Sequence, residues 1–128
     1  MSSSNPLTVA VVDDDEAVRD ALSNLLASLD LGVATFASAE EFLASPACRE
    51  AACLITDVQM PGMSGLDLQR HLTSNGSRIP VILITAFPRD QLRQQAEADG
   101  AFGFLAKPFE GRVMIDCIER ALAEKGSS

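Results

Sequence analysis

The sequence lacks tryptophan and tyrosine, so six phenylalanines supply every aromatic side chain. Its core must therefore be mainly aliphatic. The chain also has no apolar run near the ~20 residues that a membrane-spanning helix needs. Its first residues lack the basic region and apolar stretch of a signal peptide. We therefore expect a cytoplasmic protein with no membrane partner.

Basic residues are scarce, with ten Lys and Arg against eighteen Asp and Glu, for a formal net charge of −8. Such a surface repels the phosphates of nucleic acids and anionic lipids, so we expect no direct nucleic-acid binding. The one histidine, His71, lies in an expected helix and is interpreted as solvated. The cysteines, Cys48, Cys53 and Cys117, lack metal-ligand spacing and are interpreted as reduced thiols.

Hydrophobic residues make up 47% of the 128 residues, which is enough to form the buried core of one domain. Short apolar runs alternate with amphipathic stretches five times. The expected strands are residues 7–12, 33–36, 53–56, 81–84 and 101–105. The expected helices are residues 16–29, 38–44, 66 to near 75–76, 89–99 and 113–122. Five such units predict an α/β fold with a parallel sheet and helices on both faces.

Two of these helices carry further expectations. Ser38, with Glu41 three residues later, predicts a capping box, and Pro46 should end that helix. The helix over residues 89–99 has few apolar members, so its packing on the sheet should be weak.

Polar side chains stand at the carboxyl ends of four expected strands. Asp13 and Asp14 follow the first strand, and Asp57, Thr85 and Lys107 follow the third, fourth and fifth. In parallel sheets the carboxyl ends of the strands form the ligand-binding edge, so these groups should converge. Carboxylates, a hydroxyl and an ammonium group together suit a hard cation and a phosphoryl group.

The acids predict a magnesium site, because Mg²⁺ prefers oxygen ligands completed by water and phosphate. Asp14 and Asp57 are the expected direct ligands, with Asp13 acting partly through water. Mutual repulsion should raise at least one carboxyl pKa in the absence of metal. An ionised Asp57 can then attack phosphorus, while Lys107 and Thr85 stabilise the charge that develops.

Four segments resemble the receiver domains of two-component response regulators. These are residues 11–15, 56–65, 85–86 and 107–109, and the Asp-x-x-Met-Pro-x-Met-x-Gly loop beginning at Asp57 is highly specific. The resemblance implies a flavodoxin-like, CheY-like (βα)5 fold with strand order 2-1-3-4-5 over residues 7–124. Residues 1–6 would be a flexible tail and residues 125–128 a tail or linker stub.

The resemblance also implies roles for the acids. The residue matching Asp57 takes a phosphoryl group from a sensor histidine kinase. The residues matching Asp13 and Asp14 hold Mg²⁺, or Mn²⁺ as an alternative, together with Asp57 and the backbone carbonyl of Gln59. The protein would thus be a phospho-accepting signalling domain and not an enzyme, apart from catalysing its own phosphorylation and dephosphorylation.

The remaining matches concern the signal. Lys107 matches the phosphate-binding lysine, which precedes a usually cis proline, and Thr85 and Phe104 match the switch residues. We expect phosphorylation to turn Thr85 and then Phe104 inward and to shift the face formed by residues 89–105, through which two copies would pair. Gln59 and Phe87 flank the path of a water attacking the phosphoryl group, so we expect them to modulate its lifetime.

Residues 37–43 resemble receivers of nitrogen-fixation-type transcriptional regulators, which carry a C-terminal helix-turn-helix domain. The chain contains no such domain. We therefore expect either a stand-alone receiver or a fragment of a longer regulator whose output is transcription. The resemblance favours the fragment.

Other readings stay open. A metal-dependent phosphatase with an aspartyl nucleophile would need a second acid two residues after that nucleophile. Gln59 occupies this position relative to Asp57 and cannot serve as an acid. Asp13 and Asp15 have the required spacing, but Asp15 is expected to begin a helix. A receiver could also serve only to dock a protein. A flavin-binding fold would need a Ser/Thr-rich phosphate loop after the first strand, and none is present.

Overall fold

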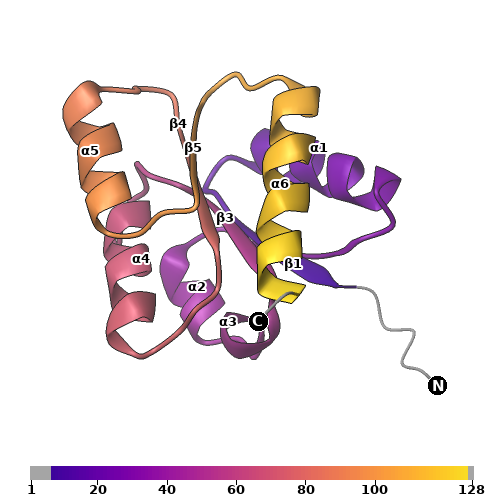
Figure 1. Ribbon diagram of the computed structural model, residues 1–128, viewed down its shortest axis with the longest axis horizontal. Helices are drawn as coiled ribbons and strands as arrows, with labels where there is room; N and C mark the ends of the chain where they lie inside the picture. The colour runs from indigo at the N-terminus through magenta and orange to yellow at the C-terminus, as the bar shows by residue number, and fades with distance from the viewer. Residues whose placement is uncertain (1–6, 127–128) are drawn as a thin grey trace.

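Five parallel strands form one sheet in the order β2-β1-β3-β4-β5 in the computed structural model, which describes residues 7–126 (Figure 1). The strands are β1 (Thr8–Val12), β2 (Gly32–Phe36), β3 (Cys53–Asp57), β4 (Val81–Thr85) and β5 (Gly103–Ala106). The predicted fold class and strand order are confirmed. The expected N-terminal tail lies outside the described residues, as do residues 127–128 of the expected C-terminal tail.

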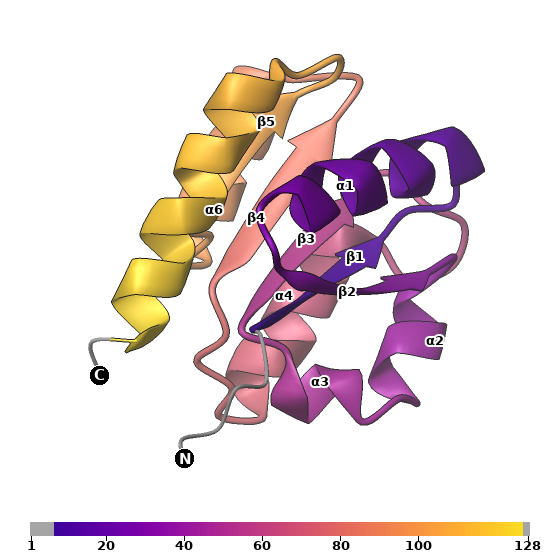
Figure 2. The ribbon, with the colours of Figure 1, turned by 90° about the vertical axis from the view of Figure 1, so that its right-hand side faces the viewer.

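Six helices accompany the strands within the described part of the chain. They are α1 (Glu16–Ser28), α2 (Ala39–Leu43), α3 (Ala47–Glu50), α4 (Gly65–Ser74), α5 (Asp90–Ala98) and α6 (Gly111–Gly126). Helices α1 and α6 cover one face of the sheet, which faces the viewer in Figure 2, and α2, α4 and α5 cover the other. None of the helices within residues 7–126 has the length and apolar character to cross a bilayer.

Alternate residues of β1, β3, β4 and β5 enter two separate cores, because successive side chains of a strand point to opposite faces. Val9 and Val11 of β1 pack toward α1 and α6, whereas Ala10 and Val12 pack toward the α2 and α4 face. Strands β3 and β4 are buried along their whole length. Burial on both faces explains why these strands read as continuous apolar runs.

The region after α2 differs from the prediction. Pro46 does not simply end a helix; it precedes the short helix α3, whose Glu50 N–H donates to the Pro46 carbonyl. Proline is suited to a helix start, because its missing N–H would have no partner there. The expected capping box of α2 is only half formed: Ser38 caps the Glu41 N–H, but the Glu41 carboxylate accepts from Ala37 N–H instead of Ser38.

Helix α6 is longer than predicted and includes two residues expected in the tail. Helix α5, as predicted, has a thin apolar stripe, and Ala96 is its one buried residue. Its C-terminal end is tied to α4 through Asp99, whose carboxylate lies 2.9 Å from Arg70 Nε and whose carbonyl accepts from Gln69 Nε2 at 3.0 Å.

Candidate functional site

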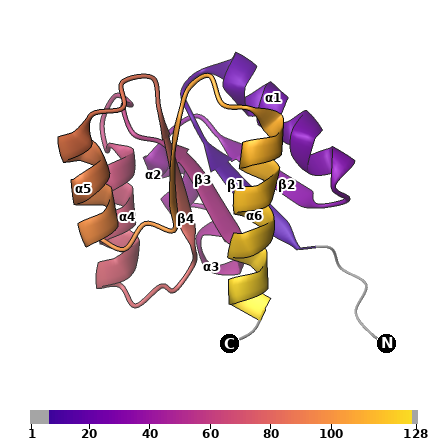
Figure 3. The same cartoon turned by 45° about the horizontal axis from the view of Figure 1, so that its top comes forward.

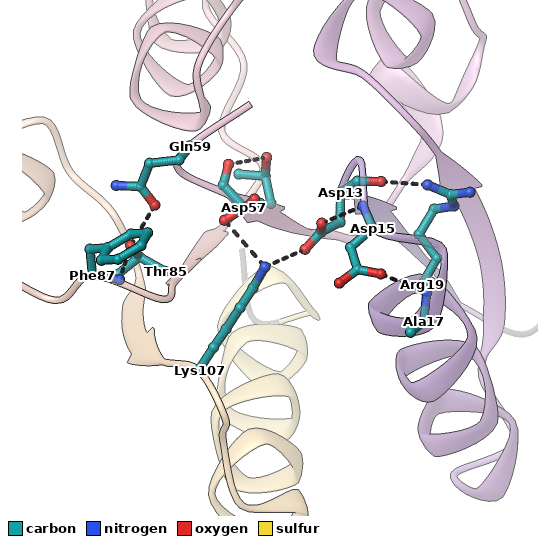
Figure 4. Close-up of polar contacts among 10 residues, drawn as sticks. Asp13, Asp15, Ala17, Arg19, Asp57, Gln59, Thr85, Phe87 and Lys107 are labelled. Atoms are coloured by element: carbon teal, nitrogen blue, oxygen red, sulfur yellow. Dashed lines mark hydrogen bonds and ion pairs between the residues drawn. The ribbon is translucent and has the colours of Figure 1, made fainter. Parts of the chain in front are cut away.

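The carboxyl ends of the strands gather the polar residues that the sequence singled out. Asp13 directly follows β1, Asp57 ends β3, Thr85 ends β4 and Lys107 follows β5. The loops after β4 and β5 lie beside each other at the top of the molecule in Figures 1 and 3. Figure 4 shows the resulting cluster, with Lys107 between Asp13 and Asp57.

Three carboxylates form the centre of the site. One carboxylate oxygen from each of Asp13, Asp14 and Asp57 lies within 4.8 Å of the others. Asp13 and Asp57 are buried, whereas Asp14 is exposed. Oxygen donors at this spacing, open to water on one side, fit a hard divalent cation such as Mg²⁺.

Lys107 partly neutralises this cluster. Its Nζ lies 2.9 Å from Asp13 Oδ2 and 3.4 Å from Asp57 Oδ1. The peptide that joins Lys107 to Pro108 is cis, as the family resemblance implied. Burial lowers the pKa of Lys107, but Asp13 and then Asp57 more than offset this effect and raise it.

The Asp57 carboxyl is harder to ionise than an ordinary aspartic acid. Burial, followed by the charge of Asp13, raises the pKa of Asp57 from 3.8 to about 6. Lys107 opposes this shift, and Asp14 adds a smaller contribution in the same direction as Asp13. A cation placed among the three acids would therefore favour the ionised form of Asp57, which is the nucleophilic one.

The Thr85 hydroxyl is directed toward Gln59 (Figure 4). It donates a hydrogen bond to Gln59 Oε1 at 2.6 Å and accepts one from the Phe87 N–H at 3.0 Å. The Phe87 side chain is 61% exposed at the mouth of the site. The sequence predicted separate roles for Thr85 and Gln59, but their side chains are joined by a hydrogen bond.

Asp15 serves α1 and is not part of the group of three acids. Its Oδ1 caps the Ala17 N–H at 2.9 Å, as its position before the helix predicted. This capping contact leaves Asp15 in a poor position to act as the second acid of a phosphatase.

Three residues that were not predicted to contribute to the site hold it in place. Arg19 Nη1 donates to the Asp13 carbonyl at 2.7 Å, and the Glu40 carboxylate accepts from Met63 N–H in the loop after β3. Gly65 donates its N–H to Val58 O, and a Cβ at this position would overlap the carbonyl oxygen of Asp57. Two of these residues could have been found from the sequence. Arg19 lies four residues after the helix cap Asp15, and Gly65 ends the motif that begins at Asp57.

Phe104, the expected switch aromatic, is half-buried on β5. The guanidinium of Arg93 on α5 lies 4.9 Å from the centre of its ring. A cation at that distance is attracted by the face of the ring. Phe104 therefore contacts α5 directly, and a movement of its ring would change its contact with Arg93 of that helix.

Comparison with known sequences decides the family. The profile of the response regulator receiver domain matches residues 9–119. The chain belongs to this family. Receiver domains are signalling domains that interact with histidine kinases, and the expected likeness to nitrogen-fixation-type regulators is confirmed by the relatives below.

Among its curated relatives, this receiver domain is 42% identical to the transcriptional regulatory protein TdiR of Thauera aromatica over 93% of the chain and 52% of TdiR. It is 40% identical to FixJ of Azorhizobium caulinodans over 94% of the chain and 58% of FixJ. The chain thus spans about half the length of these relatives.

Solved structures agree. The response regulator StyR is 42% identical with a TM-score of 0.88, over 95% of this receiver domain and 62% of the StyR chain. The structure named FixJ-N is 38% identical with a TM-score of 0.82, over 96% of both chains.

Proposed function

We propose that this receiver domain accepts a phosphoryl group on Asp57 from the phosphohistidine of a sensor histidine kinase in the cytoplasm. The observation that carries the proposal is the position of Asp57, buried beside two other carboxylates with Lys107 Nζ 3.4 Å from its Oδ1. An Asp57 oxygen attacks the phosphorus, the phosphorus–nitrogen bond breaks, and the electron pair stays on the imidazole. The product is an acyl phosphate.

The other residues of the site have distinct parts in this reaction. Asp13, Asp14 and Asp57, with the Gln59 backbone carbonyl, would hold Mg²⁺, and Mn²⁺ would be accepted in its place. When bound there, the ion would supply positive charge that favours transfer of the negatively charged phosphoryl group. Lys107 would exchange its contact with Asp57 for a contact with one phosphoryl oxygen and so place a positive charge beside it.

Incubation with acetyl phosphate tests this proposal directly. We expect intact mass to rise by one phosphoryl group in the presence of Mg²⁺, and not in its absence or in Asp57→Asn. Asp67→Asn, which removes an exposed acid outside the cluster, should be phosphorylated like the wild type. A folded wild-type protein that gains no mass would contradict phospho-acceptance and leave a protein-docking role.

The response to phosphorylation would pass through α5 and β5. A phosphoryl group adds close to two negative charges beside Thr85. Thr85 then turns inward to bond it, and Phe104 follows, releasing the ring from Arg93. Two phosphorylated copies would then pair symmetrically through this altered face.

NMR spectra recorded before and after phosphorylation test this route. We expect the largest backbone amide shift changes outside the site to fall in residues 89–105. Unchanged spectra in that segment, with Asp57 phosphorylated, would rule the route out.

Phe87 should prolong the life of the acyl phosphate. Its side chain is large, apolar and exposed beside Gln59, so it obstructs the approach of a water molecule without activating it. We expect Phe87→Glu or Phe87→Asn to speed dephosphorylation several-fold, as measured by loss of the phosphorylated mass after acetyl phosphate is removed. Equal rates in the wild type and both variants would remove Phe87 from this role.

The output would be transcription, through a DNA-binding region outside these 128 residues. The proposal is supported by the names of TdiR and FixJ as transcriptional regulatory proteins and by their roughly doubled length. The reading frame should then continue past codon 128 into a helix-turn-helix sequence. A stop codon at that point would contradict a covalently attached output domain.

A further inference from the structure

The single proton of the Thr85 hydroxyl is already engaged. A threonine hydroxyl can donate one hydrogen bond, and that of Thr85 goes to Gln59 Oε1 at 2.6 Å. Among residues 7–126, no hydrogen bond joins Thr85 to Asp57. A phosphoryl group on Asp57 can therefore receive the Thr85 proton only after the bond to Gln59 breaks.

The surroundings favour this bond in the unphosphorylated protein. Its length lies toward the short end of the range for O–H···O bonds, about 2.5–3.0 Å. Thr85 has no solvent-exposed surface, so water is not at hand to take the place of the Gln59 amide. The phosphoryl group must instead compete with Gln59 itself.

The bond can also be released without repacking the core. The Gln59 residue is exposed and lines a cavity of about 570 Å³ together with Leu66, Phe87 and Leu92. A freed amide therefore has room and water available. A charge-assisted bond from Thr85 to a phosphoryl oxygen is stronger than a neutral bond to an amide, so phosphorylation can reverse the contact.

We propose that Gln59 is a positioning residue whose side-chain oxygen holds the Thr85 hydroxyl away from Asp57 until a phosphoryl group displaces it. This inference rests on the proposed phosphorylation of Asp57 and names the group against which the phosphoryl must compete. The role belongs to the side chain, and so it is separate from that of the Gln59 backbone carbonyl in metal binding. Removing the acceptor should raise the ratio of inward-turned to outward-turned Thr85 roughly two- to tenfold.

The first test uses the unphosphorylated protein. Three-bond scalar couplings of the Thr85 methyl carbon, to its own backbone nitrogen and carbonyl carbon, report the side-chain rotamer by NMR. We expect one rotamer in the wild type, averaged couplings in Gln59→Met, which has similar length but no oxygen, and recovery in Gln59→Glu, which keeps an acceptor. Identical couplings in the wild type and a folded Gln59→Met protein would overturn the proposal.

The second test uses beryllium fluoride with saturating Mg²⁺ as a phosphoryl mimic. Gln59→Met should bind it roughly two- to tenfold more tightly than the wild type, since the mimic no longer competes with an amide. In a Thr85→Val background, which lacks the hydroxyl, the same substitution should have no effect. An effect of equal size in that background would show that Gln59 acts by another route and would overturn the proposal.

The two tests also separate this inference from the proposed function. If the wild type binds no beryllium fluoride but the couplings change as expected, phospho-acceptance fails while the Gln59–Thr85 contact stands. If binding is normal and the couplings do not change, phospho-acceptance stands and the positioning role of Gln59 fails.

Discussion

Above pH 6 and without divalent cations, Asp57→Asn should be more stable than the wild type by up to about 3 kcal/mol. The pKa of Asp57 rises from 3.8 to about 6 on folding, through burial and then the charge of Asp13. Between these two values the unfolded chain has lost the Asp57 proton while the folded protein retains it. Stability of the wild type relative to Asp57→Asn therefore falls as pH rises from about 4 to about 6, and then levels off.

Urea unfolding at intervals from pH 4 to pH 8 measures this difference. Asp20→Asn, which removes an exposed acid of α1 outside the cluster, is the control for the loss of one carboxylate. Added Mg²⁺ should narrow the gap between the wild type and Asp57→Asn, since an ion bound to the folded form stabilises it. A gap between Asp57→Asn and the wild type that does not vary with pH would contradict the raised pKa of Asp57.

Gly65→Ala should destabilise the protein by at least about 3 kcal/mol. A Cβ at position 65 would overlap the carbonyl oxygen of Asp57 and press on the Val58 backbone. These are backbone atoms, so the added methyl can be accommodated only if the start of α4 moves away from the end of β3. Such a shift would also break the bond from Gly65 N–H to Val58 O and displace the phospho-acceptor.

A matched control exists in the same chain. A Cβ at Gly111, the first residue of α6, would lie 3.8 Å from Leu25, an ordinary contact. We expect Gly111→Ala to leave stability unchanged or to raise it by up to about 1 kcal/mol. Denaturant midpoints compare the two variants. Similar midpoints would show that the space around Gly65 is not restrictive.

Most of this architecture could be predicted from the sequence. The strands were placed to within two residues, because β1, β3 and β4 are uninterrupted aliphatic runs that end at a polar residue. The meeting of Asp13, Asp57 and Lys107 followed from one rule, that the carboxyl ends of parallel strands share an edge. Neither conclusion required knowledge of side-chain orientation.

Contacts that depend on orientation could not be predicted. Gln59 and Thr85 are 26 positions apart and follow different strands, so no local pattern relates them. Helix α3 is too short to show a helical period, and the proline at its start suggested an end instead. Gly65 was recognised as part of a motif, but the reason for a glycine is the close approach of α4 to β3.

The two ends of helix α5 are held differently, although Arg93 in its first turn also packs on the Phe104 ring. Asp99 joins its C-terminal end to α4, whereas its first turn has no side-chain cap and borders the cavity beside Gln59. With Asp99 as the fixed point, the helix would act as a lever whose moving end is attached to the loop that leaves Thr85. Nine residues of helix measure roughly 13 Å, so a 10° rotation about that fixed point would shift the moving end by roughly 2 Å. Under the proposed function, a side-chain rotation at Thr85 would thereby become a backbone displacement on the surface of the protein.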